Sequence, residues 1–576
     1  MAAKGEVIPA SGDAPGARRD LERLNRRDFI RRAGLTAAGL TCADFLGYFN
    51  RKGHADESRP SFLHKAKDVA AKAEPRFLIY WYLEGGWEGY DCFNPVVTPN
   101  NIFPENRLPN ISDEHYRVLD FGKPGYGIHK EGNIRYGYLA EEGKSLFKDM
   151  AVLSSMETGS GHSAERLRCH MGHYKFAAAA EREDDERSVM QAFAEVYGQP
   201  YVLPNVSWHC WLSDGELNEV QYTGRKGYYH ALGAVHAHTI YGGTPANLSR
   251  FLQRMCDASN DVVNRQVQQF LENANSVVGD DQYVEAVKSY TSARRIYENL
   301  ADKGKSIDKP MLSKLFTDPA LKERFGVAPA DELITYRSVN GNKARTKFCP
   351  NTNVQAMMAY ELMRAGLSCA FFIESRDIRR FDSHHNRGNL WDKDGRTPKG
   401  QPDQTAMMKE HMWKPLLALV ELLKTTEYGN TGKSLYDLTT IVLTSEFGRT
   451  IRGDVDAIEK MKIPDEDKKK QIQGQDISQH WRVTSAAFLG GKVKGDRQYG
   501  GVGEKTLLAI PLMADGTLDP AYDPVTGALV KGRAKNPKSS VPDHGDVYAT
   551  ALHLSDIDPK GKGRNERPPL TYIKKA

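Results

Sequence analysis

Five short segments of the sequence gather the carboxylates, imidazoles and hydroxyls that can bind metal ions or act on esters. They are residues 84–91, 157–165, 379–386, 445–450 and 476–481. The segment 445–450 reads SEFGRT and follows the β-branched run TTIVL, which is typical of a buried strand. It places a carboxylate, a glycine and an arginine in one loop at the end of that strand. The alternative interpretation is an ordinary solvated turn.

The segment 379–386 is the densest in metal-ligand types. It reads RRFDSHHN and brings Asp382, His384 and His385 together a few residues after an apolar run. Oxygen and nitrogen donors in this combination suit zinc, manganese or iron. The segment therefore indicates a metal site, and a pair of solvent-facing histidines is the alternative.

Hydroxyl groups and glycines alternate in residues 157–165, ETGSGHSAE, just before a helix-like run. The N-terminus of a helix offers free N–H donors, so hydroxyls placed there suit a nucleophile or an anion site. Simple N-capping of the helix by Ser160 or Ser163 is the alternative.

The elements that must position these segments alternate between strands and helices. Strands are expected at 77–83, 150–156, 369–373, 439–443 and 483–489, and helices at 353–366, 405–425 and 547–554. A helical cap is expected at about 245–335, where apolar residues recur every three to four positions. This order predicts an α/β fold with a doubly wound, mostly parallel sheet, whose ligands lie beyond the carboxyl ends of the strands.

Composition excludes several classes of protein. The formal charge of +5 is small for 576 residues and the basic residues are scattered, so nucleic acid is not an expected partner. A negative mean hydropathy argues against a protein that crosses the membrane several times. The seven cysteines form no CxxC pair, which argues against a structural zinc knuckle.

The N-terminus carries an export pattern. Arg26 and Arg27 are followed by DFIR and then by a mildly apolar run, residues 33–40, which is too short for a stable membrane span. This pattern is similar to a twin-arginine signal, with cleavage expected after Ala55 and a linker over 56–74. It predicts a partner in the twin-arginine export machinery and a periplasmic or otherwise exported protein; a basic surface helix is the alternative.

Several motifs together resemble a known bacterial family. They are GGWEGYDCFNP, SSMET with a downstream histidine, FDSHH, TSEFGRT, and QHW followed by FLGGKVKGDRQYG. They resemble the exported family catalogued as domain of unknown function fifteen-oh-one, which in turn resembles the alkaline phosphatase and sulfatase superfamily in fold. The resemblance implies one alkaline-phosphatase-like α/β domain over residues 75–576.

The resemblance also implies a role for particular residues. The implied metal ligands are Asp382, His384, Glu446 and His480, with Glu84, Glu88 and Asp91 competing for the carboxylate after the first strand. Thr158 is implied as the nucleophile, with His162 four residues further on and Arg449 clamping the equatorial oxygens of the substrate. Phe447 departs from the pattern, because it stands where another ligand is expected.

These expectations point to an exported hydrolase of phosphate or sulfate esters that depends on divalent metal ions, most readily zinc or manganese. Its substrate would be a small-molecule or polymer-borne ester. A non-catalytic periplasmic binding or assembly protein on the same fold is the alternative, and a redox metal site is a third. The sequence does not determine the oligomeric state.

Overall fold

The computed structural model describes the parts of the chain that form the central sheet and most of its surroundings. These are residues 74–87, 89, 92–95, 128–159, 161–172, 188–198, 200–201, 203–207, 245, 249, 309–328, 335–337, 346–348, 351–375, 408–449, 462, 464–465, 480–503, 508–560, 562 and 567–576. The predicted signal over 1–55, Asp91, Asp382 and His384 lie outside the described residues, and so does most of the predicted linker and helical cap.

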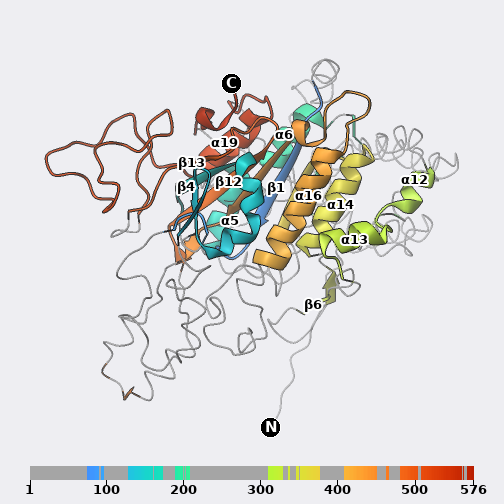
Figure 1. The fold of residues 1–576 in the computed structure, drawn as a ribbon, viewed down its shortest axis with the longest axis horizontal. Coiled ribbons are helices and arrows are strands. Elements are labelled where there is room, and N and C mark those ends of the chain that lie inside the picture. The colour runs from blue at the N-terminus through green and yellow to red at the C-terminus, as the bar shows by residue number, and fades with distance from the viewer. Residues whose placement is uncertain are drawn as a thin grey trace, which may run out of the picture.

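The described residues form a central seven-stranded sheet in the order β13-β4-β12-β9-β1-β8-β5 (Figure 1). In chain order the strands are β1 (Phe77–Leu83), β4 (Met150–Glu157), β5 (Val206–Ser207), β8 (Ala370–Ser375), β9 (Thr439–Ser445), β12 (Val483–Gly490) and β13 (Arg497–Tyr499). Strand β12 is antiparallel to both of its neighbours, and the other pairings are parallel. All strands of this sheet except β12 therefore run in the same direction.

Both faces of the sheet are covered. Every residue of β1, β8, β9 and β12 is buried. Successive side chains of a strand point to opposite faces, so a strand that is buried at every position must have packing on both sides. This confirms the predicted α/β class with a doubly wound, mostly parallel sheet.

Two groups of helices pack around the sheet. One group consists of α5 (His162–Met171), α6 (Val189–Tyr197) and α19 (His544–Leu554), which contact one another. The other consists of α13 (Pro319–Phe325), α14 (Thr352–Arg364) and α16 (Lys414–Thr425), of which α14 and α16 lie side by side (Figure 1). Helix α5 is joined to β1 by the Tyr80 hydroxyl, which donates to the Cys169 carbonyl over 2.9 Å.

Shorter elements complete the described structure. They are β2 (His129–Glu131), β3 (Ile134–Tyr136), η4 (Tyr138–Asp149), α12 (Lys309–Lys314), β6 (Thr335–Arg337), β7 (Thr346–Phe348), the π-helical turn η9 (Lys409–Trp413), η10 (Tyr436–Leu438), β10 (Gly448–Arg449), β11 (His480–Trp481) and η11 (Thr571–Ile573). None of the helices in this part of the chain is long and apolar enough to cross a membrane.

Helix ends follow local capping chemistry. Helix α14 is capped by Asn351, whose side chain accepts from the Val354 N–H, and it ends before Gly366, whose φ is +64°. Helix α19 begins at His544, three residues earlier than the predicted Val547. The reason is a capping box, in which the side chains of Asp543 and Asp546 each bond to main-chain N–H groups of the first turn.

Candidate functional site

The candidate site lies where the ends of several strands meet at one edge of the sheet. Leu83, the last residue of β1, is in register with Ser375 at the end of β8 and with Ser445 at the end of β9. The antiparallel strand β12 begins at the same edge, where Val483 pairs with Glu157 at the end of β4. The predicted strand-end loops are therefore brought to one edge, as expected for an open α/β sheet.

Serine hydroxyls at the strand ends hold the turn that follows β1. Ser445 Oγ donates to the Leu83 carbonyl over 2.6 Å and accepts from the Trp87 N–H over 3.2 Å. Ser375 Oγ accepts from the Glu84 N–H over 3.0 Å. The main chain of Glu84, a predicted metal ligand, is thereby fixed at the strand edge, and its side chain is buried.

Glu446 is the central carboxylate of the site. It is fully buried in the loop after β9, and its two oxygens have different partners. Oε2 accepts from the Tyr82 hydroxyl, whereas Oε1 accepts from the Gly85 N–H over 3.1 Å and contacts Nδ1 of His162. The structure thus brings two sequence-predicted residues, Glu446 and His162, into direct contact.

The imidazole of His480 joins this pair. His480 lies on β11, and its ring centroid is 4.3 Å from that of His162, with the two rings nearly perpendicular. Phe447 stacks on His480 with ring centroids 4.2 Å apart, and it lies 4.9 Å from the His162 ring. Phe447 is fully buried, and its ring covers one side of the two imidazoles.

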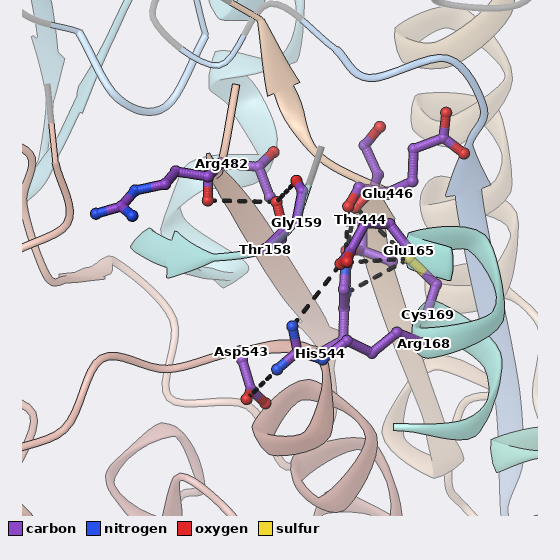
Figure 2. A network of polar contacts seen from close by, with 12 residues as sticks. Thr158, Gly159, Glu165, Arg168, Cys169, Thr444, Glu446, Arg482, Asp543 and His544 are labelled. Atoms are coloured by element: carbon purple, nitrogen blue, oxygen red, sulfur yellow. Dashed lines mark hydrogen bonds and ion pairs between the residues drawn. The ribbon is translucent and has the colours of Figure 1, made fainter. Parts of the chain in front are cut away.

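Thr158 lies directly after β4 and is mostly buried. Its N–H donates to the Arg482 carbonyl over 2.6 Å, and its hydroxyl lies 3.0 Å from the Gly159 carbonyl and 3.3 Å from the Arg482 carbonyl (Figure 2). Helix α5 begins four residues later, with Gly161 as its N-cap residue and no side-chain cap. The N-cap position is therefore held by Gly161 and Ser163 lies within the helix, whereas Ser160 lies outside the described residues.

Arg449, the predicted substrate clamp, is buried against the turn that follows β1. It was expected to clamp substrate oxygens, but its side chain is fully buried. Its Nε donates to the Gly86 carbonyl over 3.1 Å and its Nη2 donates to the Gly85 carbonyl. Its guanidinium group therefore holds the main chain of the turn after β1.

A buried polar network between helices α5 and α19 lies next to Glu446. His544 Nε2 donates to the Glu446 carbonyl over 3.0 Å, and Cys169 Sγ lies 3.3 Å from the same nitrogen. Arg168 pairs with Asp543, the N-cap residue of α19, so helices α5 and α19 are tied together next to Glu446 (Figure 2). Burial lowers the pKa of His544 to about 4, with the charge of Arg168 adding to the effect, so its imidazole is neutral near pH 7.

Sequence reasoning did not assign a site role to Tyr82, Arg482 or His544. Tyr82 is hidden in an apolar strand, and Arg482 acts through its main-chain carbonyl, so neither has a side-chain signal. His544 lies three residues before the predicted start of the last helix, Val547. A histidine placed directly after an N-cap aspartate was the one available signal.

The donor types at this edge suit a divalent cation, because a carboxylate and two imidazoles meet there. The described residues do not complete a metal site: among them, no group of three or more His, Cys, Asp or Glu residues is placed to hold an ion. The predicted ligands Asp382 and His384 belong to the segment after β8 and lie outside the described residues. Strand β8 ends at Ser375, so that segment starts at the same edge of the sheet.

The thiols of the described residues do not form disulfides. Cys92, Cys169 and Cys369 are buried and carry thiol groups. The disulfides that an exported protein would permit are therefore not found among these three.

Comparison with solved structures finds weak overall similarity. The chain is similar to the lipoteichoic acid synthase LtaP from Listeria monocytogenes, with 10% identity and a TM-score of 0.34, over 92% of this chain and 82% of that chain. It is also similar to the sulfatase PsFucS1 from Pseudoalteromonas sp., with 10% identity and a TM-score of 0.30, over 87% of this chain and 72% of that chain. TM-scores of this size do not carry a fold or a function over to this chain.

No protein-family model matches the chain, and no curated protein matches it. The family resemblance drawn from the motifs therefore stays a prediction.

Proposed function

We propose that the chain is an exported, metal-dependent hydrolase of phosphate or sulfate esters. The observation that carries the proposal is the meeting of Glu446, His162 and His480 at the carboxyl edge of the sheet. These residues come from three separate segments, after β9, at the start of α5 and before β12. Ionisable side chains gathered from distant segments at a strand edge are typical of an active site.

The proposed metal ligands are Glu446 and His480 together with Asp382 and His384. His162 adds a further nitrogen donor, and one carboxylate of residues 84–91 completes the set. A bound divalent cation polarises an ester oxygen and lowers the pKa of a coordinated hydroxyl group.

The chain's own residues would orient the reacting groups. We propose Thr158 as the nucleophile, because its main chain is fixed by the Arg482 carbonyl and its hydroxyl lies at the loop before α5. Glu446 holds Nδ1 of His162, which leaves Nε2 of that ring for a proton or a metal ion. The buried rings of Phe447 and Trp87 exclude water from one side of the site.

The experiment that tests this function combines metal analysis with a substrate panel. Purified protein that has not been supplemented with metal should contain zinc or manganese in stoichiometric amounts and hydrolyse an aryl phosphate or an aryl sulfate. Glu446→Gln should lose both properties. Glu142→Gln, which changes an exposed carboxylate of η4, should keep both. Wild-type protein that holds no such metal and is inert toward both esters contradicts the proposal.

Phe447 favours the second candidate, a non-catalytic binding or assembly protein on the same fold. Its ring packs against both imidazoles and stands where the family pattern has another ligand. Such a protein would bind an aryl phosphate or sulfate without turning it over, and Thr158→Ala would leave that binding unchanged. Turnover that disappears in Thr158→Ala, with binding retained, would rule the second candidate out.

Export by the twin-arginine route is proposed from Arg26 and Arg27. Replacing both residues by lysine should keep the full-length protein in the cytoplasm, whereas the wild type should reach the periplasm in shortened form. Fractionation of cells producing the untagged protein measures this. Full-length wild-type protein in the cytoplasm would contradict the proposed signal.

A further inference from the structure

Tyr82 makes a contact that fixes one oxygen of the central carboxylate. It is fully buried near the end of β1, where it pairs in register with Thr444 of β9. Glu446 lies two residues beyond Thr444, and a strand advances about 3.3 Å per residue, a distance that the length of a tyrosine side chain can span. The Tyr82 hydroxyl accordingly donates to Oε2 of Glu446.

The other oxygen of Glu446 has separate partners. Oε1 accepts from the Gly85 N–H over 3.1 Å and contacts Nδ1 of His162. The terminal torsion of a glutamate is broad, so a carboxylate without such bonds can exchange its two oxygens by rotation. Donors on both oxygens hold the group in one orientation.

The main chain of Glu446 is fixed as well. His544 Nε2 donates to the Glu446 carbonyl, and His544 itself is fully buried in the first turn of α19. Glu446 is thus held from β1 through its side chain and from α19 through its backbone. Among the described residues, Tyr82 bonds to Oε2, whereas Gly85 and His162 contact Oε1.

We propose that Tyr82 is a positioning residue that occupies Oε2 of Glu446 and so assigns Oε1 to His162 and to a bound cation. This assignment rests on the proposed function, in which Glu446 is a metal ligand. Removing a residue that hydrogen-bonds to a metal ligand typically changes metal affinity or activity by roughly 10- to 100-fold. Tyr82 would therefore act on the site without touching the substrate.

The test compares Tyr82→Phe with Tyr80→Phe. Tyr80 lies on the same strand, is equally buried, and donates its hydroxyl to the Cys169 carbonyl instead of to Glu446. Each variant keeps the ring and loses one buried hydroxyl group. Both should therefore unfold at a similarly lowered urea concentration.

The two variants should differ at the site. Tyr82→Phe should weaken zinc binding, measured by competition with a chelator, by roughly 10- to 100-fold, and should lower kcat with KM nearly unchanged. Tyr80→Phe should keep the zinc affinity and kcat of the wild type. If the wild type binds zinc, equal zinc affinities in the two variants would overturn the proposal.

A second measurement separates this proposal from the proposed function. In urea unfolding of metal-free protein, Tyr82→Phe and Glu446→Gln should shift the midpoint non-additively, whereas Tyr80→Phe and Glu446→Gln should be additive. If the wild type binds no zinc but the first pair is coupled, the proposed function fails and Tyr82 still positions the carboxylate. Additive effects of Tyr82→Phe and Glu446→Gln overturn the positioning role, whether or not the protein binds zinc.

Discussion

Arg449 and His480 are direct partners across the antiparallel pair of strands β10 and β11. Arg449 holds the carbonyls of the turn after β1, and His480 lies against His162 at the site. One short ladder therefore joins the group that fixes the turn to an imidazole of the site. A disturbance at Arg449 should reach both.

The first prediction concerns the buried guanidinium group. Arg449→Gln should lower the free energy of unfolding by about 3 kcal/mol, because two buried carbonyls lose their charged donors. Urea unfolding at pH 7 measures the loss. Arg482→Gln is the matched control; its side chain is half exposed and pairs with Glu157, so it should cost no more than about 1 kcal/mol. A raised KM at unchanged stability in Arg449→Gln would instead favour the substrate clamp expected from the sequence.

The second prediction concerns Gly86. Its φ of +79° is unfavourable for other residues, and an added Cβ would lie 2.5 Å from two ring carbons of Phe447. Gly86→Ala should therefore cost about 3 kcal/mol or more, part of it from moving Phe447 off His480. Gly366→Ala has a similar φ of +64° with nothing within 4 Å of the new Cβ, so it should cost only about 1 kcal/mol. Equal losses in urea unfolding would show that Phe447 is not tightly packed there.

The third prediction concerns the proposed nucleophile. Thr158→Ala should reduce the single-turnover rate on an aryl phosphate by about 1,000-fold or more, because it removes the proposed nucleophilic hydroxyl group. Thr158→Ser keeps the hydroxyl group and should retain a measurable rate. Circular dichroism should show that both variants are folded, since the lost hydroxyl bonds only to the Gly159 and Arg482 carbonyls. An alanine variant as fast as the serine variant would remove Thr158 from the mechanism.

The fourth prediction concerns stability and pH at Asp556, away from the site. Burial by itself raises the pKa of this carboxyl group, but hydrogen bonds from Lys492 and Lys574 and the charge of Arg76 outweigh it and lower the pKa from 3.8 to about 2. A lowered pKa contributes stability above pH 3.8, and the contribution is lost as the pH falls through about 2. The group is about one-third exposed, so the contribution is about 1–2 kcal/mol after discounting for solvent.

Asp556→Asn should therefore be less stable than the wild type at pH 7, with the difference shrinking between pH 4 and pH 2. Asparagine suits the φ of +61° at this position, so the backbone conformation should not change. Urea unfolding at pH 7, 4 and 3 measures the difference. A difference that stays constant over this range would contradict the role of the charge.

The central strands could be predicted well because a fully buried strand has a simple sequence pattern, a continuous apolar run. The expected strand at 77–83 coincides with β1, and the expected strand at 439–443 differs from β9 only by the polar Thr444 and Ser445. A continuous apolar run does not reveal direction, so the reversal of β12 could not be predicted. Because β12 runs in the opposite direction, its first residues lie at the site edge. His480 lies just before them and therefore reaches the site.

The candidate site was predicted in part. The family resemblance named Glu446, His162 and His480, and the structure brings them together. The environment of Arg449 could not be predicted, because an arginine that binds main-chain carbonyls has the same sequence signal as one that binds an anion. Asp91, Asp382 and His384 lie outside the described residues, so their predicted roles stay predictions.

The pairing of β10 with β11 also bears on how this fold could diversify. The chain leaves the site after Arg449 and returns to it at His480, and the two ends of that excursion are hydrogen-bonded to each other. The chain therefore departs before residue 450 and returns after residue 479 at one paired point. Evolution or engineering can change the length of the sequence between these two paired ends while His480 and Arg449 keep their places.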